Sequence, residues 1–291
     1  MNAAAQPAGG TASTERFEVD PTLPGLTFTG TFVSEFSKLL ALRTTWWLSS
    51  VAALLTVVIG ALVAVSSVVT DQDAGPGADP AALASDGTTG LAFAMILLGA
   101  LGVIAITTEF TTGAIRSSLT AAPARSLLMA AKALAVAAWT GLVTAVTVLL
   151  SHLTVALIAE PLSLSSIVTE GEVTMTYLTS WAAVLLTALM GFGLGALLRS
   201  SAGAIVTLAV ILFVIQIALS IIWGVSDGAA WADALMRMEY MYLVGEFTSE
   251  SDPQVPFGPD PMPRWQAGLG LLAWSGIPVL LGWLSFTRRD S

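Results

Sequence analysis

Six apolar runs, each long enough to cross a lipid bilayer, constrain this chain more than any other feature. They cover residues 46–68, 89–107, 133–158, 177–198, 204–223 and 267–286. At about 1.5 Å per residue, a helix of about 20 residues crosses a hydrocarbon core of roughly 30 Å. A helix also satisfies its own backbone hydrogen bonds, which a bilayer requires. The runs therefore predict an all-α membrane protein with six transmembrane helices within residues 28–291.

The composition supports this class and excludes several functions. Hydrophobic residues make up 55% and charged residues 11% of the chain, whereas soluble domains carry about 25% charged residues. With no cysteine and one histidine, a disulfide framework and a thiolate metal site are excluded, and a histidine metal site is disfavoured. A net charge of −9 argues against a nucleic-acid partner. The chain has no GxxxxGK[ST] phosphate-binding loop, so it cannot bind ATP by that route.

The first part of the chain divides into a tail and an amphipathic helix. Residues 1–27 are rich in Ala, Gly, Pro, Thr and acidic residues, which predicts a disordered cytoplasmic tail, and no cleaved signal peptide is expected. From Phe28 on, the spacing predicts a helix that lies in the membrane interface. Its apolar face carries Phe32, Phe36 and Leu39. Its other side is expected to carry Glu35, Lys38 and Arg43.

The longest segment between two spans, residues 224–266, contains a second amphipathic pattern. Its large apolar residues recur at helical spacing: Trp231, Leu235, Met238 and Tyr242. This pattern predicts a short outer helix before the sixth span. The helix is either a structural element of the outer leaflet or a lid over an exit.

The basic residues orient the chain. With both termini in the cytoplasm, nine of the eleven Lys and Arg residues lie inside: Arg16, Lys38, Arg43, Arg116, Arg125, Lys132, Arg199, Arg288 and Arg289. Only Arg237 and Arg264 lie outside. The positive-inside rule therefore favours cytoplasmic termini.

The six runs contain no charged side chain. Because proton and sodium coupling normally require carboxylates inside the membrane, a secondary transporter is disfavoured. Glu109 and Lys132 lie at span ends, where their charges are expected to reach water. His152 and Gln216 are polar exceptions, either contacts in a translocation path or members of hydrogen bonds between helices.

Two features of the later spans concern helix geometry. Gly191 and Gly195 in the fourth span form a small-residue face, which favours close helix packing over a binding site. Pro278 is expected to kink the sixth span.

The polar loop, residues 109–132, joins the second and third spans and has helix signals of its own. Thr111 or Thr112 can cap a helix start, Ile115 and Leu119 share one face, and Pro123 limits the helix at its far end. A short amphipathic helix between two spans is therefore predicted on the cytoplasmic side.

The pattern E-x3-G-x-I-R-x2-L-x3-P-x-R-x6-K from Glu109 to Lys132 resembles the first cytoplasmic loop of membrane subunits of ABC exporters of the second type, which export drugs, polysaccharides and lipids. Many relatives carry Thr where this chain has Ala114. The resemblance extends in architecture to the interfacial helix, the six spans and the outer segment.

The resemblance implies a permease of the bacterial plasma membrane with the polar loop as its coupling helix. The residues implied to contact an ATPase are Glu109, Thr112, Gly113, Ile115, Arg116, Leu119, Pro123 and Arg125. It further implies two ATPase subunits as partners, together with a second permease copy or a paralogue. ATP and Mg would bind to the ATPase, so this chain would hold no cofactor and would not itself be an enzyme.

Two functions from different classes follow. The first is the transmembrane subunit of an ATP-driven exporter for a hydrophobic or amphipathic substrate such as a drug, peptide or lipid. The second is a sensor or immunity module that works with an ATPase and binds a peptide or lipid at the outer leaflet without translocating it. An intramembrane enzyme is nearly excluded, because the spans offer no carboxylate pair and only His152 as a base.

Overall fold

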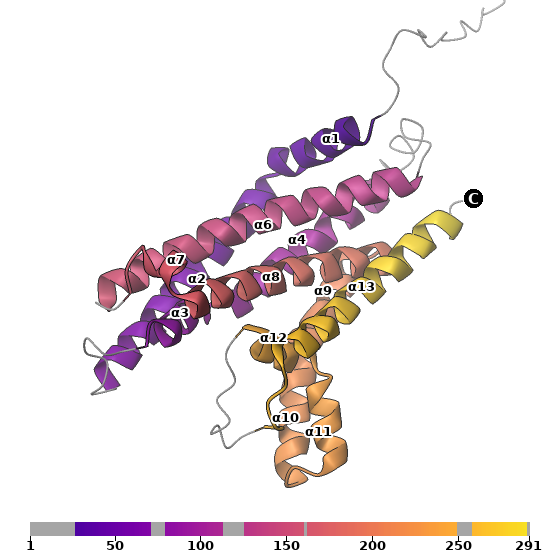
Figure 1. The fold of residues 1–291 in the computed structure, drawn as a ribbon. Coiled ribbons are helices and arrows are strands. Elements are labelled where there is room, and N and C mark those ends of the chain that lie inside the picture. The colour runs from indigo at the N-terminus through magenta and orange to yellow at the C-terminus, as the bar shows by residue number, and fades with distance from the viewer. Residues whose placement is uncertain (1–26, 71–78, 113–124, 160–161, 249–257, 290–291) are drawn as a thin grey trace, which may run out of the picture.

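The computed structural model describes residues 27–70, 79–112, 125–159, 162–248 and 258–289, and in these ranges the chain is helical with no strand (Figure 1). Six helices in these ranges are long and apolar enough to cross a membrane. They are α2 (Arg43–Thr70), α4 (Leu91–Thr112), α6 (Arg125–Ile158), α8 (Gly171–Leu198), the continuous run Ser201–Val225 and α13 (Arg264–Arg289). The six predicted spans are therefore confirmed as helices of sufficient length. An even number of crossings places the start of α2 and the end of α13 on one side of the bundle.

The fifth span is built from three pieces. They are α9 (Ser201–Ala209), a π-helical turn η1 (Val210–Val214) and α10 (Ile215–Val225). α9 packs on α4 and α8, whereas α10 extends away from the bundle beside α11 (Figure 1). No residue of α10 is buried within the chain.

Within the described ranges, five shorter helices connect or flank the spans: α1 (Phe28–Ala41), α3 (Pro80–Thr88), α7 (Ser166–Thr169), α11 (Ala230–Arg237) and α12 (Tyr240–Thr248). α1 confirms that a helix begins at Phe28, and Thr27 caps it by accepting a hydrogen bond from Gly30 N at 3.1 Å. α3 lies between the first and second spans. Asp79 caps it and Pro80 occupies its first turn, which is a usual helix start.

The single outer helix expected from Trp231 to Tyr242 is wrong, because the structure has two helices there, α11 and α12. Glu239 lies between them and is 3% exposed. Its two carboxylate oxygens accept hydrogen bonds from Met241 N at 2.9 Å and Tyr242 N at 2.6 Å, which starts a new helix. Burial raises the pKa of this carboxyl, and the two backbone donors only partly oppose that effect.

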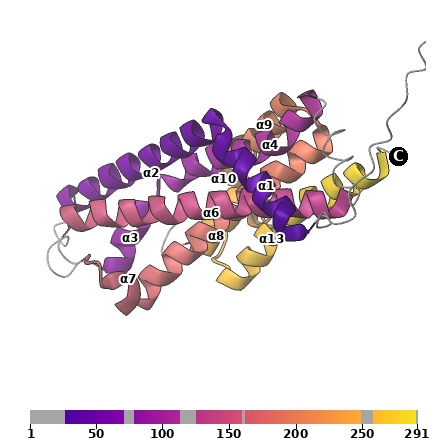
Figure 2. The ribbon, with the colours of Figure 1, turned by 90° about the horizontal axis from the view of Figure 1, so that it is seen from above.

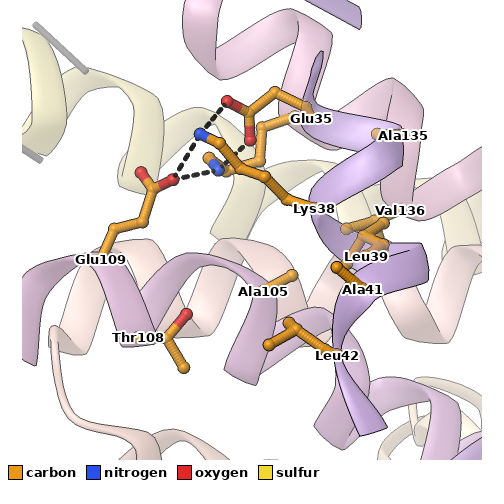
Figure 3. A pocket seen from close by; sticks show the side chains of 11 residues that line it. Glu35, Lys38, Leu39, Ala41, Leu42, Ala105, Thr108, Glu109, Ala135 and Val136 are labelled. Atoms are coloured by element: carbon orange, nitrogen blue, oxygen red, sulfur yellow. Dashed lines mark hydrogen bonds and ion pairs between the residues drawn. The ribbon is translucent and has the colours of Figure 1, made fainter. Parts of the chain in front are cut away.

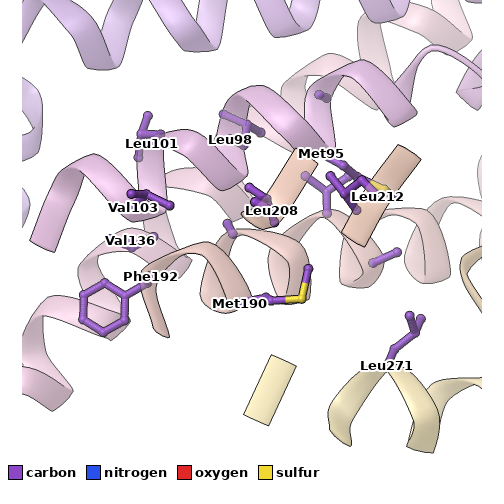
Figure 4. Packing of buried hydrophobic residues seen from close by; sticks show 14 of the residues in the cluster. Met95, Leu98, Leu101, Val103, Val136, Met190, Phe192, Leu208, Leu212 and Leu271 are labelled. Carbon is purple, nitrogen blue, oxygen red and sulfur yellow. The ribbon is translucent and has the colours of Figure 1, made fainter. Parts of the chain in front are cut away.

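α8 lies at the centre of the bundle and packs against α4, α13 and α6. Leu98 and Leu101 of α4 and Phe192 of α8 belong to the main apolar core, together with Leu208 of α9 (Figure 4). The contact between α4 and α8 depends on glycines. A Cβ at Gly191 would lie 2.2 Å from Gly99 O, and a Cβ at Gly102 would lie 2.2 Å from Ala188 O. The predicted close packing at Gly191 is therefore confirmed.

Close approach recurs where α8 meets α13. A Cβ at Gly193 would lie 2.4 Å from Val279 N. α13 continues as one helix through Pro278, beside this contact. Gly195 faces the other way, towards Val103 and Ile106 of α4. The glycines of α8 thus allow close packing against both α4 and α13, which fixes α8 between these two helices.

Candidate functional site

Four charged side chains from three helices meet at one end of the bundle: Glu35, Lys38, Glu109 and Lys132 (Figure 3). We call them the charge cluster. Lys38 Nζ lies 2.6 Å from Glu35 Oε1 and 3.2 Å from Glu109 Oε1. Lys132 Nζ lies 2.7 Å from Glu109 Oε1 and also pairs with Glu35 Oε2. Two carboxylates and two ammonium groups therefore form a closed ring of ion pairs.

The helical spacing of α1 turns Glu35 into the protein. Glu35 lies one turn after Thr31 and one turn before Leu39, and these three residues form the buried face of α1. That face packs on α6, which supplies Lys132. Lys38, three residues after Glu35, reaches back over the cluster from the exposed side of the same helix.

Three of the four groups are withdrawn from water. The exposed fraction is 4% for Glu35, 8% for Glu109 and 5% for Lys132. Two expectations from the sequence are therefore wrong: Glu35 does not lie on the solvent side of the interfacial helix, and Glu109 and Lys132 do not reach water. Buried charges of this kind are tolerated when they are paired. The pairing of residues far apart in sequence gives the physical reason for both corrections.

The ion pairs shift the pKa values of the two cluster residues of α1, Glu35 and Lys38. Burial by itself would raise the pKa of Glu35, but Lys132 and Lys38 outweigh it and hold the pKa below its ordinary value. Burial would likewise lower the pKa of Lys38, but the two carboxylates raise it above its ordinary value. Both groups are therefore charged at neutral pH.

The charge cluster joins the two ends of the polar loop to α1. Glu109 lies in the last turn of α4 and Lys132 in the second turn of α6, and the polar loop connects these helices. Seen from above, α1 crosses α6 beside the start of that helix (Figure 2). Any displacement of the polar loop would therefore act on the charge cluster, which links α1, α4 and α6.

The predicted ATPase-contacting residues fall largely outside the described residues: Gly113, Ile115, Arg116, Leu119 and Pro123. Thr111 and Thr112, expected to cap a new helix, lie instead in the final turn of α4. Arg125 begins α6. Glu109 is thus the residue of this set whose contacts the structure describes.

The end of α4 makes a second set of contacts, on another face, that the sequence did not predict. The guanidinium of Arg199 lies 5.1 Å from the centre of the Phe110 ring and donates a hydrogen bond to Ser285 O at 3.4 Å. Phe110 also meets Phe286 edge to face, with the ring centres 6.3 Å apart. Arg199 occupies the left-handed region, with φ of 53°, at the turn between α8 and α9. The end of α4 is therefore tied to α13 as well as to α1.

A cavity of about 430 Å³ adjoins the charge cluster. All four members of the cluster line it, and its other walls are mainly apolar side chains of α1, α4 and α6, among them Leu42, Ala105 and Val136. Figure 3 shows the charged groups at one end of this space and the apolar wall at the other. The cavity is thus amphipathic.

The other residues of the predicted interfacial helix divide between exposed and packed positions. Phe32 and Phe36 stack with ring centres 5.9 Å apart, and Phe36 meets Trp139 of α6. Leu39 is buried and Arg43 is exposed at the start of α2. Trp46 and Trp47 follow with exposed fractions of 53% and 71%, which is typical of residues at the headgroup level.

The two polar residues of the spans have different environments. His152 is buried, with Nδ1 2.7 Å from the Tyr177 hydroxyl and Nε2 3.0 Å from Ser163 O. A carbonyl only accepts, so Nε2 donates to Ser163, and in a neutral ring Nδ1 accepts from Tyr177. This confirms the reading of His152 as a hydrogen-bonding contact between helices. Gln216 lies on the exposed side of α10.

Replacing His152 with phenylalanine should lower the free energy of unfolding by about 1–3 kcal/mol, because Tyr177 and Ser163 would lose a buried hydrogen-bond partner. Thermal unfolding in detergent, followed by circular dichroism, measures this. Gln216→Leu is the control and should leave the midpoint unchanged, because this side chain is exposed. Equal midpoints for His152→Phe and the wild type would contradict the structural role.

The outer helices carry an exposed apolar surface. The exposed fraction is 57% for Trp231, 46% for Leu235 and 70% for Met238. Tyr242, on α12, donates a hydrogen bond to Asp260 O at 3.3 Å. Trp223 Nε1 donates to Asp233 Oδ1 at 2.6 Å and so ties α11 to the end of the fifth span.

Among the residues that the structure describes, no group of three or more His, Asp or Glu side chains is placed to hold a metal ion. The charge cluster is instead occupied by its own ammonium groups. Comparison with models of known protein families and with characterised proteins finds no match.

Proposed function

We propose that this chain is the transmembrane subunit of an ATP-driven exporter, with ATP hydrolysis supplied by a separate ATPase that grips the polar loop. The observation that carries this proposal is the charge cluster, because it fastens both ends of the polar loop to α1. Six membrane-spanning helices and the loop motif from Glu109 to Lys132 support it. The working unit would contain two such permeases and two ATPases.

The bracing around the polar loop suits the transmission of force. Glu109 and Lys132 link α4 and α6 through ion pairs, so the two helices would move with the loop rather than separately. Arg199 and Phe110 extend this connection towards α13. Tightly packed helices switch between discrete arrangements instead of deforming continuously. A pull on the loop would thus tilt several spans together and alternate access across the membrane.

The cargo class follows from the polarity of the bundle. Glu109 of α4 and Lys132 of α6 lie near the helix ends and pair with each other, and the described core between the spans is apolar. A strongly charged cargo would have no partner there. A hydrophobic or amphipathic substrate, such as a drug, peptide or lipid, fits best.

Arg116→Glu is expected to abolish association with the ATPase while leaving membrane insertion intact. Arg116 is the first basic residue of the loop motif, and charge reversal there would replace attraction by repulsion. Affinity purification of the tagged chain from native membranes, with mass spectrometry of bound P-loop ATPases, measures this. Gly113→Pro should act in the same way, because proline disfavours the helical conformation of the preceding residue, Thr112, in the last turn of α4.

A matched control for this experiment is Arg264→Glu, which changes a partly exposed arginine on the opposite end of the bundle. It should retain the ATPase. Equal recovery of the ATPase with the wild type, Arg116→Glu and Gly113→Pro would refute the role assigned to the loop.

The exposed apolar side of α11 supports the second candidate function. In that case the chain would be a sensor or immunity module that binds a peptide or lipid at the outer leaflet. Trp231, Leu235 and Met238 offer such a surface. ATP-dependent uptake into inside-out vesicles separates the two functions, because only an exporter moves its ligand across the membrane. Retention of ligand at the vesicle surface without uptake would favour the sensor.

A further inference from the structure

The charge cluster leaves hydrogen-bonding positions open. Glu109 Oε2 is buried and has no hydrogen-bond partner among the described residues. Figure 3 shows the contrast between its two oxygens, since all contacts drawn to Glu109 converge on Oε1. An ammonium group has three donors, and Lys38 and Lys132 each use two of them on the carboxylates. The cluster thus retains one free acceptor and, on each lysine, one free donor. The donor of Lys38 belongs to the more exposed lysine.

The cavity beside the cluster is expected at the membrane interface. Leu42, in its wall, is followed by the exposed tryptophans Trp46 and Trp47 at the start of α2. Tryptophans in this setting mark the depth of the lipid headgroups. The cavity volume of about 430 Å³ is within the range of small-molecule sites. Lipid headgroups are therefore the molecules that meet this cavity at the highest concentration.

We propose that the cavity binds one phospholipid with a primary ammonium headgroup, that is, an ethanolamine phospholipid from the leaflet beside α1. Its ammonium donates to Glu109 Oε2, its phosphate accepts from Lys38, and its acyl chains lie along the apolar wall of Leu42, Ala105 and Val136. The terminal torsion of a glutamate side chain is broad, so the Glu109 carboxylate turns towards the cavity when the lipid binds. The headgroup ammonium then takes the place of Lys38 on this carboxylate, and Lys38 turns to the phosphate.

Charge balance selects this headgroup over its common alternatives. The cluster pairs two carboxylates with two ammonium groups, so a zwitterionic headgroup keeps the site neutral. A choline headgroup is also zwitterionic but has no N–H to donate to Glu109. A glycerol headgroup would add an uncompensated negative charge. Selectivity for ethanolamine is the signature of the proposed contact.

This proposal does not depend on export. It requires only that the chain lies in a membrane, and it is tested without an ATPase or ATP. Lipid selectivity can therefore fail while transport is observed, and transport can fail while selectivity is observed.

The experiment is native mass spectrometry of the delipidated full chain mixed with equal amounts of phosphatidylethanolamine, phosphatidylcholine and phosphatidylglycerol that carry the same acyl chains. The wild type is expected to retain one phosphatidylethanolamine at least about tenfold more strongly than either competitor, as a charge-assisted hydrogen bond would give. Equal retention of the three lipids would overturn the proposal.

Two variants test the site from opposite ends. Glu109→Gln weakens the contact to the ammonium, and Ala41→Phe fills the cavity from its exposed rim without touching the cluster. Both should lose the selectivity. Glu172→Gln, which removes an exposed carboxylate paired with Arg264 at 3.1 Å, should keep it. Gel filtration shows whether Glu109→Gln folds. If it does not, the test rests on Ala41→Phe, and undiminished lipid selectivity in that variant would contradict the proposed site.

Discussion

Replacing Lys132 with methionine is expected to lower the free energy of unfolding by about 3–5 kcal/mol, because it leaves two buried carboxylates with Lys38 as their remaining cation. Lys132 is 5% exposed and pairs with both Glu35 and Glu109. Burying an unbalanced charge costs more than the loss of an ordinary contact. Thermal or denaturant unfolding of the purified chain in detergent measures the effect.

The double variant Lys132→Met with Glu35→Gln should recover part of this stability, since the pair of Lys38 and Glu109 would remain balanced. The matched control is Arg264→Met, which breaks a partly exposed ion pair with Glu172. Exposed pairs contribute about 0–1 kcal/mol, so this change should be small. An effect of Lys132→Met no larger than that of Arg264→Met would mean that the charge cluster does not stabilise the fold.

Alanine at Gly191 should destabilise the bundle by at least about 2 kcal/mol, because the added methyl group would lie 2.2 Å from Gly99 O. The obstacle is backbone, so no side-chain rotation relieves it and α4 and α8 must separate. Gly102→Ala should behave alike, with its methyl group 2.2 Å from Ala188 O. The unfolding midpoint in detergent and the yield of monodisperse protein both measure the loss.

Gly276→Ala provides the control for these glycines. Gly276 lies within α13, and a Cβ there meets nothing within 4 Å. Alanine is the better helix former, so this variant should be neutral or slightly more stable. If Gly191→Ala and Gly276→Ala unfold at the same midpoint, the close approach of α4 and α8 is not what holds the bundle.

The spans could be predicted from the sequence because hydrophobicity over some twenty residues is a local property. The fourth span, expected at 177–198, is the helix Gly171–Leu198. The first span, expected at 46–68, is the helix Arg43–Thr70. The helices extend beyond the apolar runs because polar residues continue the helical hydrogen bonds into the interface, where hydropathy gives no signal.

The charge cluster could not be predicted in the same way. Glu35 is 97 residues from Lys132, and Lys38 is 71 residues from Glu109. Periodicity placed Glu35 with the polar residues of α1, whereas packing on α6 buries it. One signal was present: Glu109 and Lys132 carry opposite charges at the two ends of a single loop, so they were candidates for a pair.

The outer segment shows a different limit. The apolar spacing from Trp231 to Tyr242 correctly indicated helix, but it does not report where one helix ends and the next begins. Glu239 decides that by accepting the first backbone N–H groups of α12. A carboxylate at a helix start is a recognisable signal, although the surrounding apolar pattern concealed it.

The central claim is that an ATPase outside this chain moves cargo by pulling on the polar loop. The most direct test is uptake of fluorescent amphipathic dyes and lipids into inside-out vesicles that contain this chain, with and without its ATPase. The account predicts ATP-dependent uptake only when both are present, and its loss with Arg116→Glu. Uptake by this chain alone, or the same uptake with Arg116→Glu, would contradict it.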